Sequence, residues 1–336
     1  MRLDAYMGVC LGDPELGYYA TRDPFGAGGD FVTAPEVSQM FGELAGAWAA
    51  QVWADAGAPD PFVLAELGPG RGTLMRDALR AAAGMPGLRA AARLWLVETS
   101  PVLRARQAEA LAEHRPAWTG SVAELPGGPL LVVANEFFDA LPVRQFQRLD
   151  ALWRERFVGL EDGRPVTVWG RGRGDADLDR RFPQAGDGAV VELSEAGEAL
   201  AATLGARIAR DGIAALVVDY GTEAGTGDTL QAMRRHAPVD PLAAPGEADL
   251  TAHVGFAALR EAARPARGWG PVPQGVFLER LGITARARAL ARAGGAAAEA
   301  VAAAHRRLTH PEEMGNLFRV LAFTPDDASP PPGFEG

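Results

Sequence analysis

The stretch that decides the fold of this chain is FVLAELGPGRG, residues 62–72. Its apolar first half, interrupted only by Glu66, predicts a buried strand that runs into a tight turn. Every second residue of the turn is then a glycine, which permits positive φ angles and lets a ligand approach the backbone closely. Helical spacing follows over residues 73–83, so free N–H groups at the helix start face the turn. The stretch therefore predicts a strand–turn–helix unit with a ligand site at the turn.

The glycine spacing distinguishes two kinds of cofactor that bind at such a turn. A dinucleotide fingerprint, G-x-G-x-x-G, would place its third glycine at position 73, where this chain has Thr73. The third glycine is Gly72 instead, and the pattern Glu-x-Gly-x-Gly-x-Gly resembles the first motif of class I S-adenosylmethionine (SAM) methyltransferases. SAM is thus favoured over NAD, while a turn that merely joins strand to helix stays open as a third interpretation.

A second acidic residue, Glu98, ends the next predicted strand, residues 93–98. In nucleotide-binding sheets this position holds the ribose diol. Because SAM and NAD both contain an adenosine ribose, Glu98 supports a nucleoside ligand without choosing between them. The alternative is an ordinary acidic charge at the start of the helix that Pro101 opens. The predicted cofactor-binding residues are Glu66, Gly68, Gly70, Gly72, Glu98 and Thr33.

Composition and charge narrow the class of protein. The 336 residues are 48% hydrophobic and 23% charged, as in an ordinary globular chain. A net charge of −10 argues against nucleic acid or an anionic membrane as a partner. The single cysteine, Cys10, excludes an internal disulfide, and no zinc-type spacing of Cys and His occurs, so we expect no metal.

Targeting signals and membrane segments are not expected. No apolar run has the length needed to span a membrane. Residues 1–4 include an early acid and precede no apolar stretch of the kind found in signal peptides. We therefore expect a cytoplasmic bacterial protein, and a mitochondrial one only if a transit peptide is missing from this sequence.

The chain divides into five segments by composition and periodicity. We expect a helical leader over residues 1–60, a first part of the core over 61–142, an antiparallel β insertion over 143–190, a second part of the core over 191–325 and a disordered tail over 326–336. Short buried strands alternate with helices in the core, which is typical of a parallel sheet. The predicted fold class is α/β, a Rossmann-like class I SAM methyltransferase sheet with a helical leader and an inserted antiparallel β region.

Three segments carry more specific expectations. In the leader, one helix should run from about residue 34 to 56, with Thr33 as its cap, after a glycine-rich loop at residues 26–29. The Gly- and Pro-rich residues 222–252 are loop-like and long enough to be functional. A single Ala/Arg-rich helix should cover residues 285–307.

A third motif, NEFFDALP at residues 135–142, follows another predicted strand. Ligands bind beyond the carboxyl ends of parallel strands, so the acids of this motif should meet those that end the other strands. Those acids are Glu66, Glu98 and Asp219. Carboxylates there would suit a cationic acceptor beside the sulfonium of SAM, because they reduce the repulsion between two positive charges. Glu136 and Asp139 could hold a guanidinium through paired charge-assisted bonds; a turn cap is the alternative role for Asp139.

Asn135 also resembles the asparagine of the N-P-P-[YF] motif of methylases that act on planar amino groups. Here Glu136 and Phe137 replace the two prolines, and a carboxylate suits a charged acceptor better than a neutral base, which favours arginine. His253, next to the loop-like segment, is a candidate general base, with a packed or capping histidine as the alternative. The predicted catalytic residues are Asn135, Glu136, Asp139 and His253.

Together these motifs make the chain similar to the MidA-like family, which includes the mitochondrial complex I assembly factor that methylates an arginine of a core complex I subunit. The similarity runs from about Ala5 to Phe323. The matching runs are AYM at residues 5–7, LGYY at 16–19, GDFVTAPEVSQMFGE at 29–43, ELGPGRGTL at 66–74, NEFFDALP at 135–142 and DYG at 219–221. The resemblance implies a seven-stranded sheet with an antiparallel last strand, SAM as cofactor and, at least in mitochondrial members, a protein arginine as acceptor.

Two departures from the family pattern bear on the acceptor and the leader. The family has a further helix ahead of residue 5, and its DLTxHVDF run becomes DLTAHVGF at residues 249–256, where Gly255 replaces an acid. The expected partner is a protein substrate, which the resemblance extends to a complex I subunit, and a homodimer is left open. An assembly chaperone that keeps SAM as a ligand and a small-molecule methyltransferase stay as alternatives.

Overall fold

The computed structural model describes residues 1–21 and 32–335, and its centre is one twisted sheet. The strands lie in the order β14-β15-β9-β4-β1-β2-β3. Their bounds are β1 Phe62–Leu67, β2 Ala92–Val97, β3 Ala117–Thr119, β4 Leu130–Asn135, β9 Ile213–Thr222, β14 Arg267–Pro273 and β15 Phe318–Thr324. The last strand, β15, is antiparallel to both of its neighbours, and the other strands of this series are parallel to one another. A short strand, β13 (Val254–Gly255), pairs with β9. The predicted Rossmann-like sheet is confirmed.

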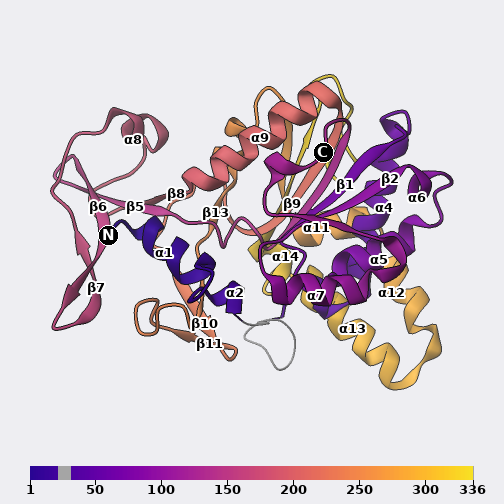
Figure 1. The fold of residues 1–336 in the computed structure, drawn as a ribbon, viewed down its shortest axis with the longest axis horizontal. Coiled ribbons are helices and arrows are strands. Elements are labelled where there is room, and N and C mark those ends of the chain that lie inside the picture. Colours follow the sequence, from indigo (N-terminus) through magenta and orange to yellow (C-terminus); the bar gives the residue numbers. More distant parts are fainter. Residues whose placement is uncertain (22–31, 336) are drawn as a thin grey trace.

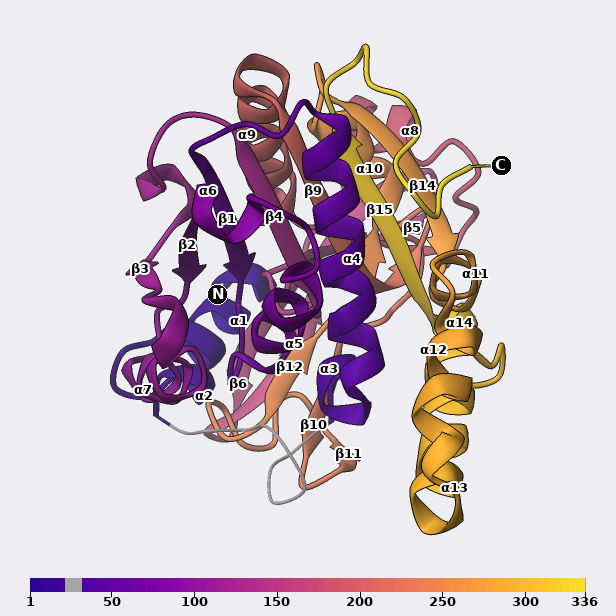
Figure 2. The ribbon, with the colours of Figure 1, turned by 90° about the vertical axis from the view of Figure 1, so that its right-hand side faces the viewer.

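Helices cover both faces of this sheet because successive side chains of each strand point to opposite sides. On one face, Leu64 and Val133 pack against α4 (Gln39–Asp55) and α5 (Thr73–Ala82), which lie in front of the sheet in Figure 2. On the other face, Ala65 and Val132 pack against α9 (Glu195–Asp211) and α10 (Phe256–Ala262). The remaining helices of the core are α6 Leu88–Ala91, α7 Pro101–Ala110, α11 Gln274–Arg280, α12 Ile283–Leu290, α13 Gly295–Thr309 and α14 Met314–Leu317.

The leader differs from the single long helix predicted after Thr33. The chain forms α3 (Ala34–Val37), becomes extended at Ser38 and then starts α4. Ser38 caps α4, since its Oγ accepts a hydrogen bond from the Met40 N–H at 3.2 Å, whereas the Thr33 side chain makes no capping bond. The predicted cap was therefore wrong, because an extended residue interrupts the helical spacing. The predicted loop at residues 26–29 lies outside the described residues.

The start of the leader packs away from α4, next to the inserted β region. It forms α1 (Leu3–Gly12) and α2 (Tyr18–Thr21), two helices of the expected helical leader whose bounds the sequence analysis did not give. Leu3 and Met7 of α1 are buried in one apolar cluster with Val158 of the insertion and Leu250. Figure 1 shows α1 between the inserted strands and the main sheet. The leader therefore packs in two places: α1 against the inserted β region, and α4 against the main sheet.

The antiparallel hairpins expected within residues 143–190 are present. They form a four-stranded sheet in the order β7-β6-β5-β8, with α8 (Ala176–Arg181) beside it. The strands are β5 Arg144–Leu149, β6 Leu152–Glu161, β7 Arg164–Trp169 and β8 Val190–Leu193. This sheet projects from the main body on the left of Figure 1 and has its own small core around Phe146 and Trp153.

The segment 222–252 is not the loop that its Gly and Pro content indicated. It holds a three-stranded antiparallel sheet in the order β11-β10-β12, with strands β10 (Gln231–Arg234), β11 (Ala237–Val239) and β12 (Asp249–Thr251). Ala232 and Leu250 anchor it by burial against α1. Strands of three or four residues leave too short a period to be recognised in a sequence, and their stability comes from that tertiary contact.

Two expectations for the end of the chain were also wrong. The helix expected over residues 285–307 is split into α12 and α13, and the break falls at Gly294, whose φ is +71°. The predicted disordered tail is packed instead: the Phe334 ring is buried with its centroid 5.4 Å from that of Phe277. Arg280 Nη1 also donates a hydrogen bond to the Gly333 carbonyl at 3.0 Å. Within the described residues, no helix combines the length and apolar character that crossing a membrane requires.

Candidate active site

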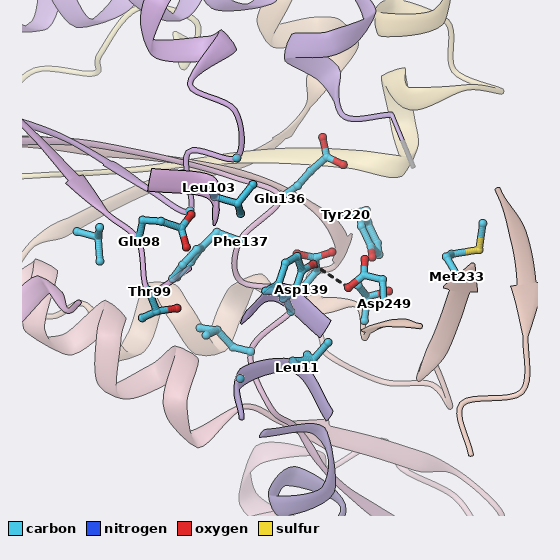
Figure 3. Close-up of a pocket in the computed structure, with 18 of the residues that line it drawn as sticks. Leu11, Glu98, Thr99, Leu103, Glu136, Phe137, Asp139, Tyr220, Met233 and Asp249 are labelled. Atoms are coloured by element: carbon cyan, nitrogen blue, oxygen red, sulfur yellow. Dashed lines mark hydrogen bonds between the residues drawn. The ribbon is translucent and has the colours of Figure 1, made fainter. Parts of the chain in front are cut away.

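A cavity of about 550 Å³ opens beyond the carboxyl ends of β1, β2, β4 and β9. Its volume is in the usual range for small-molecule sites. We call one part the glycine-loop half, and it is lined by Gly68, Gly70, Val97, Glu98, Thr99, Leu103, Gly120 and Phe137. We call the other part the acidic half, and it is lined by Tyr19, Glu136, Asp139, Tyr220, Gln231, Met233, Asp249, Thr251, His253 and Phe318. Figure 3 shows Glu98 and Thr99 at one end and Tyr220, Asp249 and Met233 at the other.

The glycine loop borders the cavity at two of its three glycines. Gly68 and Gly70 have φ angles of +56° and +52° and line the cavity. A Cβ on Gly68 would lie 2.7 Å from Phe137 Cδ2, so a side chain there would collide with an aromatic ring of the site. Gly72, with φ +82°, instead precedes α5 and faces α7 rather than the cavity. The motif therefore divides into two glycines at the ligand site and one at the helix start.

Glu98 lies where the sequence placed it, at the end of β2 and in the glycine-loop half. Its Oε1 accepts a hydrogen bond from the Ser100 N–H at 2.8 Å, and its Oε2 accepts one from Gln107 Nε2 at 3.1 Å. Burial raises the pKa of this carboxyl. Gln107 also donates to the Gly70 carbonyl at 2.8 Å, so it ties the glycine loop to the acid, a role that its sequence position did not reveal.

Three of the predicted residues, Glu66, Thr33 and Asn135, lie behind the glycine loop rather than in the main cavity. They line a separate small cavity of about 30 Å³. Burial raises the pKa of Glu66 to about 8. Glu66 Oε2 and Asn135 Oδ1 are buried, and the described residues give neither atom a hydrogen-bond partner. These residues shape and support the loop from its far side.

Glu136 lines the acidic half from a turn that directly follows β4. Its φ is +51°, and its N–H donates to the Val218 carbonyl at 2.9 Å, which fixes the turn against β9. Its Oε1 accepts bonds from the Ala34 N–H at 2.9 Å and from Asn135 Nδ2 at 3.2 Å. Loss of water contacts raises the pKa of Glu136 to about 8, and the nearby Asp139 adds to the shift. Asn135 thus positions Glu136.

Asp219 was expected among the acids at the sheet edge. It lies there and binds the backbone of the turn that follows β4. Its Oδ2 accepts hydrogen bonds from the N–H groups of Phe137 at 3.1 Å, Phe138 at 2.9 Å and Asp139 at 3.2 Å. Asp219 is fully buried and does not line the cavity. Because three successive N–H groups donate to one oxygen, Asp219 fixes the backbone of the turn that carries Glu136.

Asp139 and His253 lie together in the acidic half, near Tyr220. Asp139 is 5% exposed, and its Oδ1 has no hydrogen-bond partner among the described residues. Burial raises the pKa of Asp139 to about 6, a shift that the Tyr220 hydroxyl opposes. His253 packs edge-on against the Tyr220 ring, with centroids 5.5 Å apart, and its N–H donates to Thr229 Oγ1 at 2.8 Å. Burial lowers the pKa of His253, so the imidazole is neutral near pH 7.

The structure also brings in residues that the sequence interpretation missed. Asp249 of β12 is buried, and its Oδ1 accepts a hydrogen bond from the Tyr19 hydroxyl at 2.7 Å. Met233, Thr251 and Phe318 complete the walls of the acidic half. Tyr19 and Asp249 both belong to runs that match the family, which is the signal that could have identified them.

The ionisable side chains that line the cavity are mainly acidic. Four acidic side chains line it: Glu98, Glu136, Asp139 and Asp249. None of the described residues that line it is a lysine or an arginine. Nor does any group of three or more His, Cys, Asp or Glu side chains in the described ranges suit a metal ion. Since buried carboxyls need a cation or a proton nearby, the cavity suits a positively charged organic ligand.

Comparison with known proteins assigns a family to these features. A family model for S-adenosyl-L-methionine-dependent methyltransferases matches residues 44–272. The protein arginine methyltransferase NDUFAF7 homolog of Drosophila melanogaster is 37% identical over 95% of this chain and 80% of that protein. The human protein arginine methyltransferase NDUFAF7 is 33% identical over 95% of this chain and 79% of that protein. Both relatives are mitochondrial by name.

A solved structure is similar over the whole fold. It is a protein from Burkholderia thailandensis bound to S-adenosyl-homocysteine (SAH), with 32% sequence identity and a TM-score of 0.84. The alignment covers 100% of this chain and 89% of that one. The residues of the glycine-loop half fit the same kind of ligand, because two glycines free of side chains and a buried carboxyl meet at one end of the cavity.

Proposed function

The chain belongs to the family of S-adenosyl-L-methionine-dependent methyltransferases, and from this premise we propose that its methyl acceptor is the guanidinium group of a protein arginine. The observation that carries the proposal is the acidic half, where Glu136, Asp139 and Asp249 face a cavity that no described lysine or arginine lines. The names of the relatives, protein arginine methyltransferases, support the same acceptor.

The cofactor would occupy the glycine-loop half. When bound, SAM supplies a methyl group on a positively charged sulfur. The backbone at Gly68 and Gly70 would border it closely, and the Glu98 carboxyl would accept hydrogen bonds from the ribose diol. Ser100 and Gln107 hold that carboxyl in place before the ligand arrives. Preorganised partners of this kind reduce the entropy lost on binding.

The walls of the acidic half suit the shape of an arginine side chain. Leu11, Leu141, Met233 and Leu317 provide apolar contacts for a long aliphatic stem, and the acids provide acceptors for a planar cation. Glu136 neutralises and orients the guanidinium beside the donor. One proton leaves the guanidinium for each methyl group added, and the Glu136 carboxylate, whose pKa is raised to about 8, is suited to take it.

Partner and location follow from the proposal and the family resemblance. We propose a subunit of respiratory complex I as the protein substrate and the cytoplasm of a bacterial host as the place of the reaction. A homodimer stays a prediction. His253 stays a candidate general base in this scheme, because a neutral imidazole beside Tyr220 can accept a proton.

The test measures methyl transfer by Glu136→Gln, a variant in which the side chain keeps its size and shape but loses its charge. Protein and labelled SAM are incubated with lysate of the host, and the labelled product is hydrolysed and analysed for methylarginine. We expect Glu136→Gln to bind SAH with near-normal affinity but to transfer methyl groups at least about a hundredfold more slowly, on the order of 3 kcal/mol for one lost electrostatic contact. Glu161→Gln, an exposed carboxyl at the tip of the β6–β7 hairpin, is the matched control.

Each outcome points to one function. Methylarginine formed by the wild type and lost in Glu136→Gln supports the proposal. Transfer at the wild-type rate by Glu136→Gln would remove the case for arginine and favour a small-molecule acceptor. SAH binding with no labelled product from the wild type would favour the assembly chaperone.

A further inference from the structure

We propose that Asp249, held by the hydroxyl of Tyr19, is a second acceptor-binding carboxyl that acts with Glu136 and makes the acidic half select a guanidinium over an ammonium group. This inference rests on the proposed function, since it assigns a further residue to the same acceptor.

The small sheet places Asp249 on the wall of the cavity. β10 and β12 pair in a register that sets Met233 opposite Asp249 and Gln231 opposite Thr251. Directly opposed residues in an antiparallel pair share one face of the sheet, and all four of these residues line the cavity. Ala232, on the opposite face, is buried against α1. Figure 3 shows Asp249 and Met233 at the same end of the cavity as Tyr220.

Tyr19 fixes the orientation of this carboxyl. Its hydroxyl donates to Asp249 Oδ1 at 2.7 Å, and Asp249 is 5% exposed. The Tyr19 ring packs edge-on against Tyr18, which is fully buried, with centroids 5.1 Å apart. A short charge-assisted bond from a rigid aromatic side chain restricts the rotamers of the acid. The leader therefore contributes one element of the acceptor site.

A separate observation concerns Asp139, the third acid of this half, which has one unpaired oxygen. Asp139, which lines the acidic half together with Glu136 and Asp249, has a buried Oδ1 without a hydrogen-bond partner among the described residues. An unpaired buried acceptor is unfavourable unless a ligand satisfies it. The lining includes no described lysine or arginine that could do so.

The chemistry of the ligand follows from the number and placement of these acceptors. A guanidinium presents five N–H donors in one plane, whereas an ammonium presents three from a single point. Carboxyls on two walls, at Glu136 after β4 and at Asp249 on β12, can bind different edges of a planar cation. An ammonium group would satisfy fewer of them, so the second carboxyl should contribute more to arginine than to lysine.

The experiment uses two probes of equal charge, N-acetyl-L-arginine amide and N-acetyl-L-lysine amide, titrated by calorimetry into the full-length protein loaded with SAH. For Asp249→Asn we expect at least about a tenfold loss of affinity for the arginine probe, the loss expected for one charge-assisted bond, and little change for the lysine probe. SAH affinity should stay at the wild-type value, which also reports that the variant is folded. Asp240→Asn, an exposed acid on the same segment, is the matched control.

A second variant tests the role of the leader and covers the case in which Asp249→Asn fails to fold. Tyr19→Phe removes only the hydroxyl and should lower the affinity for the arginine probe severalfold, again without a change for lysine. Unchanged arginine affinity in the folded variants, or equal losses for both probes, would overturn the assignment of Asp249. A wild-type protein without preference for the arginine probe would instead overturn the proposed function, so the two failures are distinguishable.

Discussion

The glycine-loop half and the acidic half share one cavity, but they are assembled over very different distances along the chain. The glycine-loop half comes from residues between Gly68 and Phe137, on consecutive strands of the parallel sheet. The acidic half draws residues from between Tyr19 and Phe318, on the leader, the β4 turn, the small sheet and β15. A site built locally leaves a motif in the sequence, and a site built from distant segments leaves isolated residues.

The two halves also differ in how their acids are satisfied. Glu98 in the glycine-loop half already accepts hydrogen bonds from Ser100 and Gln107. Asp139 in the acidic half has a buried oxygen without a described partner, and the pKa of Glu136 is raised to about 8. The acid of the first half is therefore already held in place by neighbouring donors, whereas the second half keeps one buried acceptor without a described partner, which the proposed cationic acceptor would satisfy.

The largest expected effect is a loss of SAH affinity caused by a substitution in the glycine-loop half. Gly68→Val would place a branched side chain at φ +56°, with its Cβ 2.7 Å from the Phe137 ring, so the loop and the ring must shift. We expect SAH affinity, measured by calorimetry, to fall more than about a hundredfold, a loss of about 2.7 kcal/mol or more.

Gly72→Ala is the matched control for that variant. Gly72 also has a positive φ but faces α7, so alanine there should lower the free energy of unfolding by about 1–2 kcal/mol and leave SAH affinity close to the wild-type value. Normal SAH binding by Gly68→Val would mean that the turn only joins strand to helix.

A smaller effect is expected from the acid of the same half. Glu98→Ala removes the acceptor for the ribose hydroxyls and should weaken SAH binding about ten- to hundredfold, because a charge-assisted bond contributes roughly 1.5–3 kcal/mol. Binding of N-acetyl-L-arginine amide should stay unchanged, since Glu98 lies at the far end of the cavity (Figure 3). Glu109→Ala, an exposed acid on α7, is the control. Equal losses for both ligands would show that the halves are not separate.

The smallest effect concerns pH and should appear only in the acidic half. With a pKa of about 8, most Glu136 side chains are protonated at pH 7 and must release the proton before pairing with a guanidinium. The ionised fraction rises roughly fivefold from pH 7 to pH 8, and affinity for the arginine probe should rise with it. Calorimetry in two buffers of different ionisation enthalpy should detect the released proton. A pH dependence that persists in Glu136→Gln would assign the titration to another group.

The same raised pKa has a consequence for stability. The unfolded chain ionises Glu136 near its ordinary pKa of 4.5, and the folded chain does so only near 8. The contribution of this group to the free energy of unfolding is therefore fully present below about pH 4.5 and is lost as the pH rises towards 8. Glu136→Gln should flatten that part of the pH profile in thermal denaturation.

Particular residues show where sequence reasoning succeeded and where it failed. Glu98 and Glu136 lie on the cavity as expected, because each stands at the end of a buried strand and parallel strands bring their carboxyl ends to one edge; their roles stay predictions. The same rule placed Asp219 at the edge but did not predict that it would bind the turn N–H groups. Thr33 and Glu66 were expected at the cofactor and lie behind the glycine loop. A strand's end can be located from periodicity, whereas the direction of a single side chain after it cannot.

The sequence by itself determined the α/β sheet, the inserted hairpins and the glycine-loop half of the cavity. These features depend on local spacing, namely apolar runs, glycines at alternate positions and acids at strand ends, which one chain segment encodes alone. Only the tertiary structure decided the break at Ser38, the packing of Phe334 on Phe277 and the wall formed by β10 and β12. Those features depend on apolar contacts between distant segments, and short segments have no stable conformation until such contacts form. The acidic half belongs to this second group, since Tyr19 and Asp249 meet only when the leader and the small sheet pack together.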